Sequence, residues 1–384
     1  MARFRVTGPG ILAQGRRVEG CDLLVANGHV VGLVQAGART PGYETVTCPG
    51  LAAPGFVDVH IHGFAGVSFA DADAGADAID TARTRLHEVG VAAFVASLPS
   101  LPPDQIVARA RNLALSVGRR EAGKATIAGI HLEGPYLSPG HRGAHPVDLL
   151  RRPDAAELAG WLDAAGGTVR QVTLAPEIEG QAEVARLLVG RGVVAAIGHT
   201  SADMATAQAA AAEGYGHVTH LWNGMSGIAH RAPGAVAAAL AHPALTAEVI
   251  CDGVHIEPAI VALTHRLLGS DRMCVVTDAI AAAGHTDGDY VLSGRTIHVR
   301  DGVARTEEGN LAGSTLTMAR AVENLVAWGV VAVDEAVEMA TATPARALGL
   351  SGWGRIAPEA PATLIALDDR GRLLDWPERT VLEG

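Results

Sequence analysis

The chain has 384 residues, of which 48% are hydrophobic and 18% are charged, and this composition excludes global disorder and suits a large buried core. Its formal net charge of −11 argues against a nucleic-acid or anionic-membrane surface, because both need clustered Lys and Arg. The sequence has no secretory leader, no apolar run of the roughly 18 residues that span a membrane, and four widely spaced cysteines, so we expect a reduced, cytoplasmic protein.

The first fifty residues predict a small β structure. They contain short β-rich segments, and Asn27-Gly28 is a strong signal for a hairpin turn. Residues 352–384 at the other end of the chain have the same β-rich texture. Because chain ends often lie close together, we predict one small β-sandwich domain built from residues 1–53 and 352–384.

The middle of the chain, residues 54–351, alternates short apolar runs with Ala-rich helical patterns. One predicted helix can be capped by Thr200 or Ser201, and Gly214 is placed to end it. Eight apolar runs separated by helices predict an α/β fold, a (β/α)8 TIM-like barrel whose parallel strands are buried on both faces. A doubly wound open sheet is the rival fold, but it would carry a GxGxxG turn after its first strand, and the sequence has none.

Five of the apolar runs end in side chains that can bind a metal or move a proton: His60 and His62, Glu133, His199, His220 and Asp278. The carboxyl ends of barrel strands meet at one mouth, and His60 and His62 share a face because they are two residues apart on a strand. Imidazole and carboxylate ligands suit Zn²⁺ or a similar divalent ion. Such an ion lowers the pKa of a water in an open coordination position to about 7. The sequence therefore predicts a metal site at the barrel mouth.

Each of these residues also has a purely structural interpretation. A lone histidine near a strand end is usually a hydrogen-bonded core or loop residue, Glu133 can cap the next segment, and Asp278 can cap the turn after it. Polar residues at five strand ends are nevertheless hard to explain as independent accidents, because buried polar groups cost free energy unless they are paired. His217 precedes His220 by three, which places it on the opposite face of a strand. We assign structural or surface roles to His29, His87, His242, His265 and His298.

A series of motifs in this order resembles the amidohydrolase superfamily: PGFVDVHIHG, HLEGPYL, GAH, GHT, THLWNGM, DGVH, VTDA and LAGSTLTM. HLEGP together with THLWNGM is similar, more narrowly, to the N-acetylglucosamine-6-phosphate deacetylase family, since most of the superfamily has a carboxylated lysine where this chain has Glu133. The resemblance implies a hydrolase of linear amide bonds. It would convert N-acetyl-D-glucosamine 6-phosphate to D-glucosamine 6-phosphate and acetate in amino-sugar catabolism.

The resemblance also assigns roles in metal binding and catalysis. It implies that Glu133, His199 and His220 hold the main metal, most simply Zn²⁺, and that Asp278 is the general base and later the acid. Some members have Gln and Asn in place of the HxH pair and bind one metal. The pair present in this chain therefore allows a second metal site, at His60 and His62.

Substrate contacts follow from the same resemblance, for nine residues: His145, Ala144, Asn223, Gly224, Arg231, His255, Leu311, Ala312 and Gly313. In the family, the arginine that matches Arg231 reaches the phosphate from the neighbouring subunit, which implies a homodimer. An arginine binds a phosphate bidentately, and His255 can add a charge-assisted hydrogen bond.

Two other functions fit the predicted barrel less well. A cyclic-amide hydrolase such as a dihydroorotase needs a bridging lysine at a strand end, and Lys124 precedes its strand. A barrel that had lost catalysis and served as a binding protein should lack metal ligands or the base, and this chain has candidates for all of them.

Overall fold

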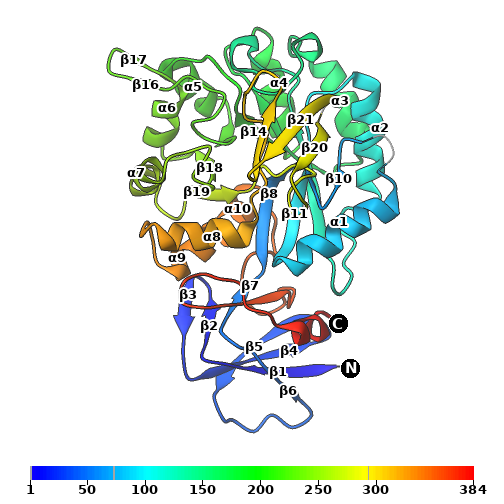
Figure 1. Ribbon diagram of the computed structural model, residues 1–384, viewed down its shortest axis with the longest axis vertical. Helices are drawn as coiled ribbons and strands as arrows, with labels where there is room; N and C mark the ends of the chain where they lie inside the picture. Colours follow the sequence, from blue (N-terminus) through cyan, green and yellow to red (C-terminus); the bar gives the residue numbers. More distant parts are fainter. Residues whose placement is uncertain (1, 72–73, 293) are drawn as a thin grey trace.

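The computed structural model describes residues 2–71, 74–292 and 294–384 and shows a barrel above a small β domain (Figure 1). The eight predicted runs form one parallel sheet in the order β19-β18-β15-β14-β13-β12-β11-β8. These strands are β8 (Phe56–Ile61), β11 (Val91–Leu98), β12 (Thr126–Glu133), β13 (Val169–Leu174), β14 (Val194–Ile197), β15 (Tyr215–Val218), β18 (Thr246–Ile250) and β19 (Met273–Val276).

The first and last strands of this sheet meet just past their carboxyl ends. The backbone N–H of Asp278 donates to the carbonyl of His60 at 2.9 Å, and the N–H of His62 donates to the carbonyl of Ala279 at 2.8 Å. These bonds nearly close the sheet into a barrel, which confirms the predicted TIM-like fold. They also bring the segment of His60 and His62 beside the segment of Asp278.

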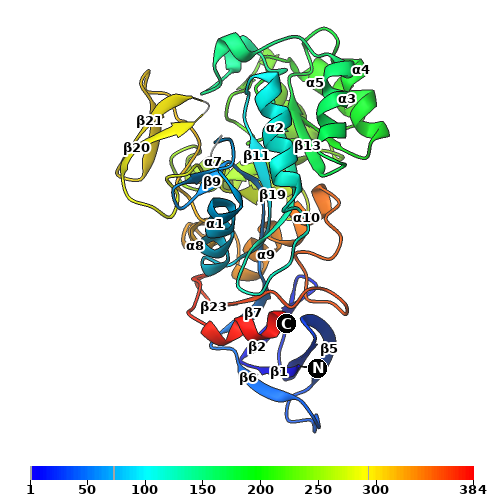
Figure 2. The same ribbon diagram turned by 90° about the vertical axis from the view of Figure 1, so that its right-hand side faces the viewer.

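Helices surround the barrel strands in both views (Figures 1 and 2). They are α1 (Ala76–Glu88), α2 (Pro103–Ala114), α3 (Ala155–Ala164), α4 (Gln181–Gly190), α5 (Met204–Ala212), α6 (Ala235–Ala241), α7 (Pro258–Leu268), α8 (Met318–Ala327), α9 (Val333–Met339) and α10 (Ala342–Ala347). Helices and strands share one apolar core, in which the rings of Phe69 and Phe94 stack with centroids 5.4 Å apart. Within the described part of the chain, no helix has the length and apolarity needed to cross a membrane.

The start of α5 differs from the prediction. Its N-cap is Asp203, whose carboxylate accepts a hydrogen bond from a first-turn backbone N–H at 2.8 Å. Thr200 and Ser201 do not cap the helix, because their hydroxyls bond to Glu177. Gly214 follows the last turn with a φ of 107°, as predicted, since glycine tolerates this conformation better than other residues.

The two ends of the chain form two four-stranded sheets below the barrel, β5-β4-β1-β6 and β23-β7-β2-β3 (Figure 1). Their strands are β1 (Arg3–Thr7), β2 (Gly10–Ala13), β3 (Arg16–Val18), β4 (Cys21–Ala26), β5 (His29–Gln35), β6 (Glu44–Thr47), β7 (Leu51–Pro54) and β23 (Leu364–Leu367). Side chains from both sheets form a second core, which includes Val25, Leu364 and Trp376. Asn27 and Gly28, with φ of 51° and 75°, make the predicted turn between β4 and β5. The domain boundaries near residues 53 and 352 stay a prediction.

A three-stranded antiparallel sheet follows β19, in a segment for which no strand is predicted above. It consists of β20 (Gly288–Leu292), β21 (Arg295–Arg300) and β22 (Val303–Thr306), and it has a small core of its own that contacts Ala144. Figure 2 shows this sheet projecting from the barrel on the side away from α3 and α4.

The remaining described elements are short. They are the strands β9 (Gly63–Phe64), β10 (Val67–Ser68), β16 (Ile228–Ala229) and β17 (Ala232–Pro233), and the 3₁₀ turns η1 (Pro139–His141), η2 (Val147–Leu149) and η3 (Pro377–Glu383). Strands β16 and β17 form an exposed hairpin that projects from the barrel beside α6 (Figure 1).

Truncating the stacked ring of Phe94 tests whether the barrel core stabilises the fold. Phe94 is fully buried, so Phe94→Ala will lower the free energy of unfolding by about 3–5 kcal/mol through lost burial and a residual cavity. Leu115→Ala is the control, because Leu115 is 77% exposed and its truncation will change stability by less than about 0.5 kcal/mol. Urea unfolding followed by circular dichroism measures both, and equal midpoints would contradict the assignment of this core.

Candidate active site

The six predicted ligand and base residues converge at the carboxyl ends of the barrel strands, and each is at most 8% exposed: His60, His62, Glu133, His199, His220 and Asp278. Three of them lie within two residues after a strand and have positive φ, namely His199 at 46°, His220 at 29° and Asp278 at 49°. Non-glycine residues rarely take this conformation, and it recurs at functional sites. The strand therefore ends sharply at each of these positions.

One oxygen of Glu133 faces a pair of histidines. Glu133 Oε1 lies 3.0 Å from His199 Nε2 and 3.0 Å from His220 Nε2, and the two nitrogens are 3.0 Å apart. His199 Nδ1 donates to the carbonyl of His141 at 2.8 Å, which leaves Nε2 as the nitrogen that faces Glu133. The imidazole nitrogens and the carboxylate oxygen thus face one another at hydrogen-bond distance.

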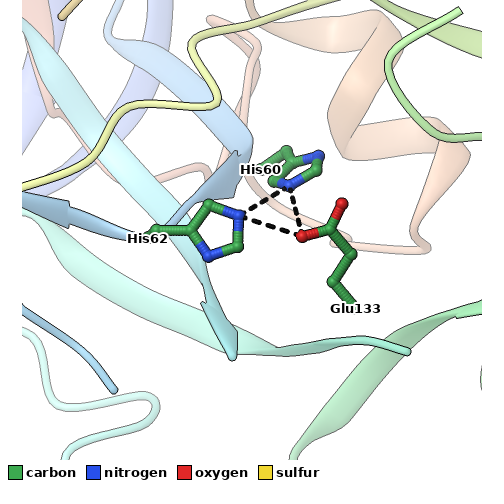
Figure 3. Close-up of side chains that lie close together, drawn as sticks. All are labelled: His60, His62 and Glu133. Carbon is green, nitrogen blue, oxygen red and sulfur yellow. Dashed lines mark hydrogen bonds and ion pairs between the residues drawn. The ribbon is translucent and has the colours of Figure 1, made fainter. Parts of the chain in front are cut away.

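The other oxygen of Glu133 faces the HxH pair. His62 Nε2 lies 3.1 Å from Glu133 Oε2 and 3.1 Å from His60 Nε2, as the dashed lines in Figure 3 show. Asp278 Oδ1 lies 3.3 Å from His62 Nε2 and 3.4 Å from His60 Nε2. Glu133 thus separates two groups of donor atoms, one with His199 and His220 and one with His60, His62 and Asp278.

Both groups fit a divalent cation. Imidazole nitrogens and carboxylate oxygens are the ligands that Zn²⁺ and similar ions take, and electron pairs packed about 3 Å apart in a buried mouth need a shared positive charge. His60, His62 and Glu133 form one compact metal-binding set, and Glu133, His145 and His199 form another. The geometry brings all five predicted metal ligands together.

Asp278 is a carboxylate suited to accept a proton. Burial alone would raise its pKa, but the charge of His60 and the hydrogen bond and charge of His62 outweigh burial and lower the pKa to about 2. The group is therefore ionised at neutral pH.

His145 reaches the same mouth as a hydrogen-bond donor. Its Nδ1 accepts the backbone N–H of Ser100 at 3.3 Å, so the ring proton is on Nε2, which lies 3.5 Å from Glu133 Oε2. Burial lowers the pKa of His145 to about 4, despite the nearby Glu133 charge. A neutral ring that carries its proton on Nε2 suits a substrate contact better than a metal ligand.

A cavity of about 270 Å³ opens over these groups. It is lined by eight of the nine predicted substrate contacts: Ala144, His145, Asn223, Gly224, His255, Leu311, Ala312 and Gly313. Leu292, at the end of β20, and Asn310 line it as well, so the unpredicted three-stranded sheet forms part of its wall.

His255 lines this cavity beside the carboxylate of Asp252. Its Nδ1 lies 2.7 Å from Asp252 Oδ2. Burial lowers the pKa of His255, but the hydrogen bond and the charge of Asp252 outweigh burial and raise the pKa above its ordinary value. A raised pKa increases the share of the cationic ring at neutral pH, which favours an anionic ligand.

Arg231, the ninth predicted contact, does not line the cavity of its own chain. It lies exposed at the turn of the projecting β16–β17 hairpin (Figure 1). The cavity of a single chain therefore lacks the predicted contact between Arg231 and phosphate.

Glu248 and His217 lie directly beneath the predicted ligands and are fully buried. His217 Nε2 lies 3.1 Å from Glu248 Oε1, and Glu248 Oε2 lies 2.8 Å from His60 Nδ1. The sequence places His217 on the strand face opposite His220, but both residues contact Glu248. His217 lies within β15 but His220 follows it, where the positive φ ends the alternation of a strand. The sequence signal for Glu248 is a single acid inside the apolar run TAEVIC.

Residues 51–381 match the model of the amidohydrolase family, and the chain belongs to this family, whose members are metal-dependent. Among its relatives, the N-acetylglucosamine-6-phosphate deacetylase of Vibrio furnissii is 39% identical over 297 residues, 77% of this chain and 73% of that one. The N-acetylgalactosamine-6-phosphate deacetylase of Escherichia coli O157:H7 is 38% identical over 319 residues, 83% of this chain and 84% of that one.

Solved structures show the same similarity. A mutant N-acetyl-D-glucosamine-6-phosphate deacetylase of Mycobacterium smegmatis, in complex with N-acetyl-D-glucosamine-6-phosphate, superposes with a TM-score of 0.90 at 36% identity over 97% of each chain. The Thermotoga maritima N-acetylglucosamine-6-phosphate deacetylase superposes with a TM-score of 0.84 at 30% identity, also over 97% of each chain.

Removing a ligand tests the metal site directly. Glu133→Gln will lower the metal content and the activity together, because Glu133 faces both groups of nitrogens and the amide is a poorer ligand. His199→Ala will do the same at the site it shares with His220, since two remaining ligands hold Zn²⁺ weakly. Elemental analysis of the purified variants measures this. Full metal occupancy in both variants would show that the main metal site lies elsewhere.

Proposed function

We propose that this protein hydrolyses the acetamide of N-acetyl-D-glucosamine 6-phosphate and releases D-glucosamine 6-phosphate and acetate. The observation that carries the proposal is the buried Glu133, each of whose two oxygens faces a pair of histidines. The cavity above it is also lined by Asp278 and His255. Relatives with this activity in their names support the substrate. The reaction belongs to amino-sugar catabolism, and we place it in the cytoplasm.

Glu133, His199 and His220 would hold the main ion, with Zn²⁺ as our choice because its ligands are nitrogens and carboxylates. The second oxygen of Glu133, together with His60 and His62, would hold a second ion. A divalent cation at this place polarises the acetamide carbonyl and acidifies a water molecule.

Asp278 is the general base and then the general acid. Its ionised carboxylate accepts a proton from the attacking water and then delivers a proton to the leaving amine nitrogen. Its position beside His60 and His62 holds it in the ionised form before reaction. His145, with its proton on Nε2, donates a hydrogen bond to the bound substrate.

The phosphate is recognised away from the metal, so that it does not compete as a ligand. His255 supplies one charged contact from within the cavity. Arg231 of the partner subunit supplies a second in a homodimer, because its hairpin projects from the barrel and leaves the guanidinium outside its own cavity.

An assay of acetate and free amine release tests the proposed function. The substrates are N-acetyl-D-glucosamine 6-phosphate, its galactosamine epimer and unphosphorylated N-acetyl-D-glucosamine. The epimer is included because relatives of both kinds match this chain at similar identity. We expect the highest kcat/KM on the glucosamine phosphate. No acetate from any of the three would overturn the proposal.

Asp278→Asn tests the base. Asn is nearly isosteric and cannot accept the proton of water, so kcat will fall by about 10²–10⁴-fold. Metal content will stay near that of the natural chain, because the five predicted metal ligands are untouched. A variant with near-normal kcat would show that another group carries the proton.

Arg231→Ala tests phosphate recognition. We expect a loss of about 2–5 kcal/mol in kcat/KM on the phosphorylated sugar, as for a charged contact whose partner is left unpaired, and little change on the unphosphorylated sugar. Equal losses on both substrates would instead mean that Arg231 supports the hairpin or the dimer.

A mixing experiment tests whether this arginine comes from the partner subunit. Arg231→Ala and Glu133→Gln chains are each nearly inactive, but a mixed dimer holds one site in which both residues are intact. Activity on the phosphorylated sugar should therefore return on mixing. Failure to recover any activity from verified mixed dimers would contradict a contact between subunits.

A further inference from the structure

A buried carboxylate lies under the two groups of ligands. Glu248 is on β18, inside the barrel, and is 0% exposed. Its Oε2 accepts hydrogen bonds from His60 Nδ1 at 2.8 Å and from the backbone N–H of His220 at 3.0 Å. Its Oε1 lies 3.1 Å from His217 Nε2 and 2.9 Å from Gln171 Nε2.

The four partners come from three other segments of the barrel, at β8, β13 and β15. A buried carboxylate is costly unless its lone pairs are satisfied, and an apolar side chain of similar volume would fill the same space at less cost. Packing of the barrel interior therefore does not require a glutamate at position 248. The contact of Glu248 with His60 gives a reason for it.

The contact with Glu248 decides which nitrogen of His60 is free. In the neutral ring that would bind an ion, Nδ1 donates to the carboxylate and Nε2 carries the lone pair. This Nε2 lies 3.1 Å from His62 Nε2 and 3.8 Å from Glu133 Oε2. A carboxylate that accepts from the far nitrogen of a metal-binding histidine fixes its ring and raises its basicity.

The main group of ligands is supported differently. His199 Nδ1 donates to a neutral carbonyl, that of His141, at 2.8 Å. Glu248 touches His220 only at its backbone N–H and does not contact its ring nitrogens. The side-chain charge of Glu248 is therefore directed at His60 alone among the metal-binding rings.

We propose that Glu248 is the positioning residue of the second metal site: it holds His60 as a ligand for an ion shared with His62 and Glu133. This inference rests on the two-ion form of the proposed function. It predicts that loss of the Glu248 charge weakens the second ion and spares the first.

Glu248→Gln removes the charge and keeps the shape. The amide oxygen can still accept from His60 and from the backbone N–H of His220. Gln171 faces Glu248 Oε1 with its Nε2, and its own Oε1 is buried without a hydrogen-bond partner among the described residues. A flip of the Gln171 amide would let this Oε1 accept from the new amide nitrogen. Glu248→Asp is the second variant, because it keeps the charge but draws it back from His60 by one methylene.

The experiment is a titration of metal-stripped protein with Zn²⁺, followed by calorimetry and by elemental analysis after gel filtration. We expect two ions per chain in the natural protein. In Glu248→Gln and Glu248→Asp the first ion will bind with unchanged affinity, and the second will bind about 10–100-fold more weakly. Activity is not the readout, so the result does not depend on the identity of the substrate.

Glu383→Gln is the matched control. Glu383 Oε1 lies 2.7 Å from His87 Nε2, in a carboxylate–histidine contact below the barrel whose side chains are 5–6% exposed, and it touches no predicted ligand. This variant should bind both ions as the natural chain does. The melting temperatures of the metal-free variants show whether either substitution disturbs the fold.

Three results would overturn the inference. They are a second ion of natural affinity in both Glu248 variants, equal weakening of both ions together with a lower melting temperature of the metal-free chain, and a single ion in the natural protein. None of these results would contradict the proposed deacetylation, which is tested separately by acetate release from the natural enzyme.

Discussion

The site depends on one buried carboxylate placed between histidines. Glu133 ends β12 at the barrel mouth, and its two oxygens face separate pairs of imidazole nitrogens. Oε1 lies 3.0 Å from the Nε2 atoms of His199 and His220, and Oε2 lies 3.1 Å from that of His62 and 3.8 Å from that of His60. Such a cluster is costly unless positive charge is shared among its members, because the carboxylate and the imidazoles are almost wholly buried. Metal binding and the folding of the mouth are therefore coupled, and the cation that catalysis needs also stabilises its own ligands.

The barrel supplies the convergence that this arrangement requires. Eight parallel strands bring residues far apart in the sequence to one mouth, and the positive φ of His199, His220 and Asp278 ends each strand sharply at that point. Beneath the mouth, the barrel interior contains hydrogen-bonded polar side chains. His131 bonds to Thr173 at 2.7 Å, and Glu248 bonds to four groups at once. The ligands are thus supported from below, which limits their movement when substrate binds.

Much of the barrel and of its site could be predicted from the sequence, because continuous apolar runs identify buried parallel strands. A polar residue at the end of such a run costs free energy unless it is paired, so it marks a candidate site residue. All eight barrel strands and the convergence of the six mouth residues follow from that rule. The pairing of Glu248 with His60 could not be predicted, since it joins strands 188 residues apart and depends on register. The contact of His217 with Glu248 could not be predicted either. The alternation of side chains along a strand relates His217 to its neighbours only up to Val218, where β15 ends. The sheet of β20–β22 is half-exposed and short, and its strands lack a continuous apolar run.

Anomalous diffraction at the zinc absorption edge tests the central role of Glu133 most directly. Crystals of the Zn²⁺-loaded protein should show one peak bordered by Glu133 Oε1, His199 and His220, and a second bordered by Glu133 Oε2, His60 and His62. Both peaks should weaken in Glu133→Gln, because both ions share its carboxylate. Strong peaks that do not touch Glu133, or peaks that survive unchanged in the variant, would contradict the site described above.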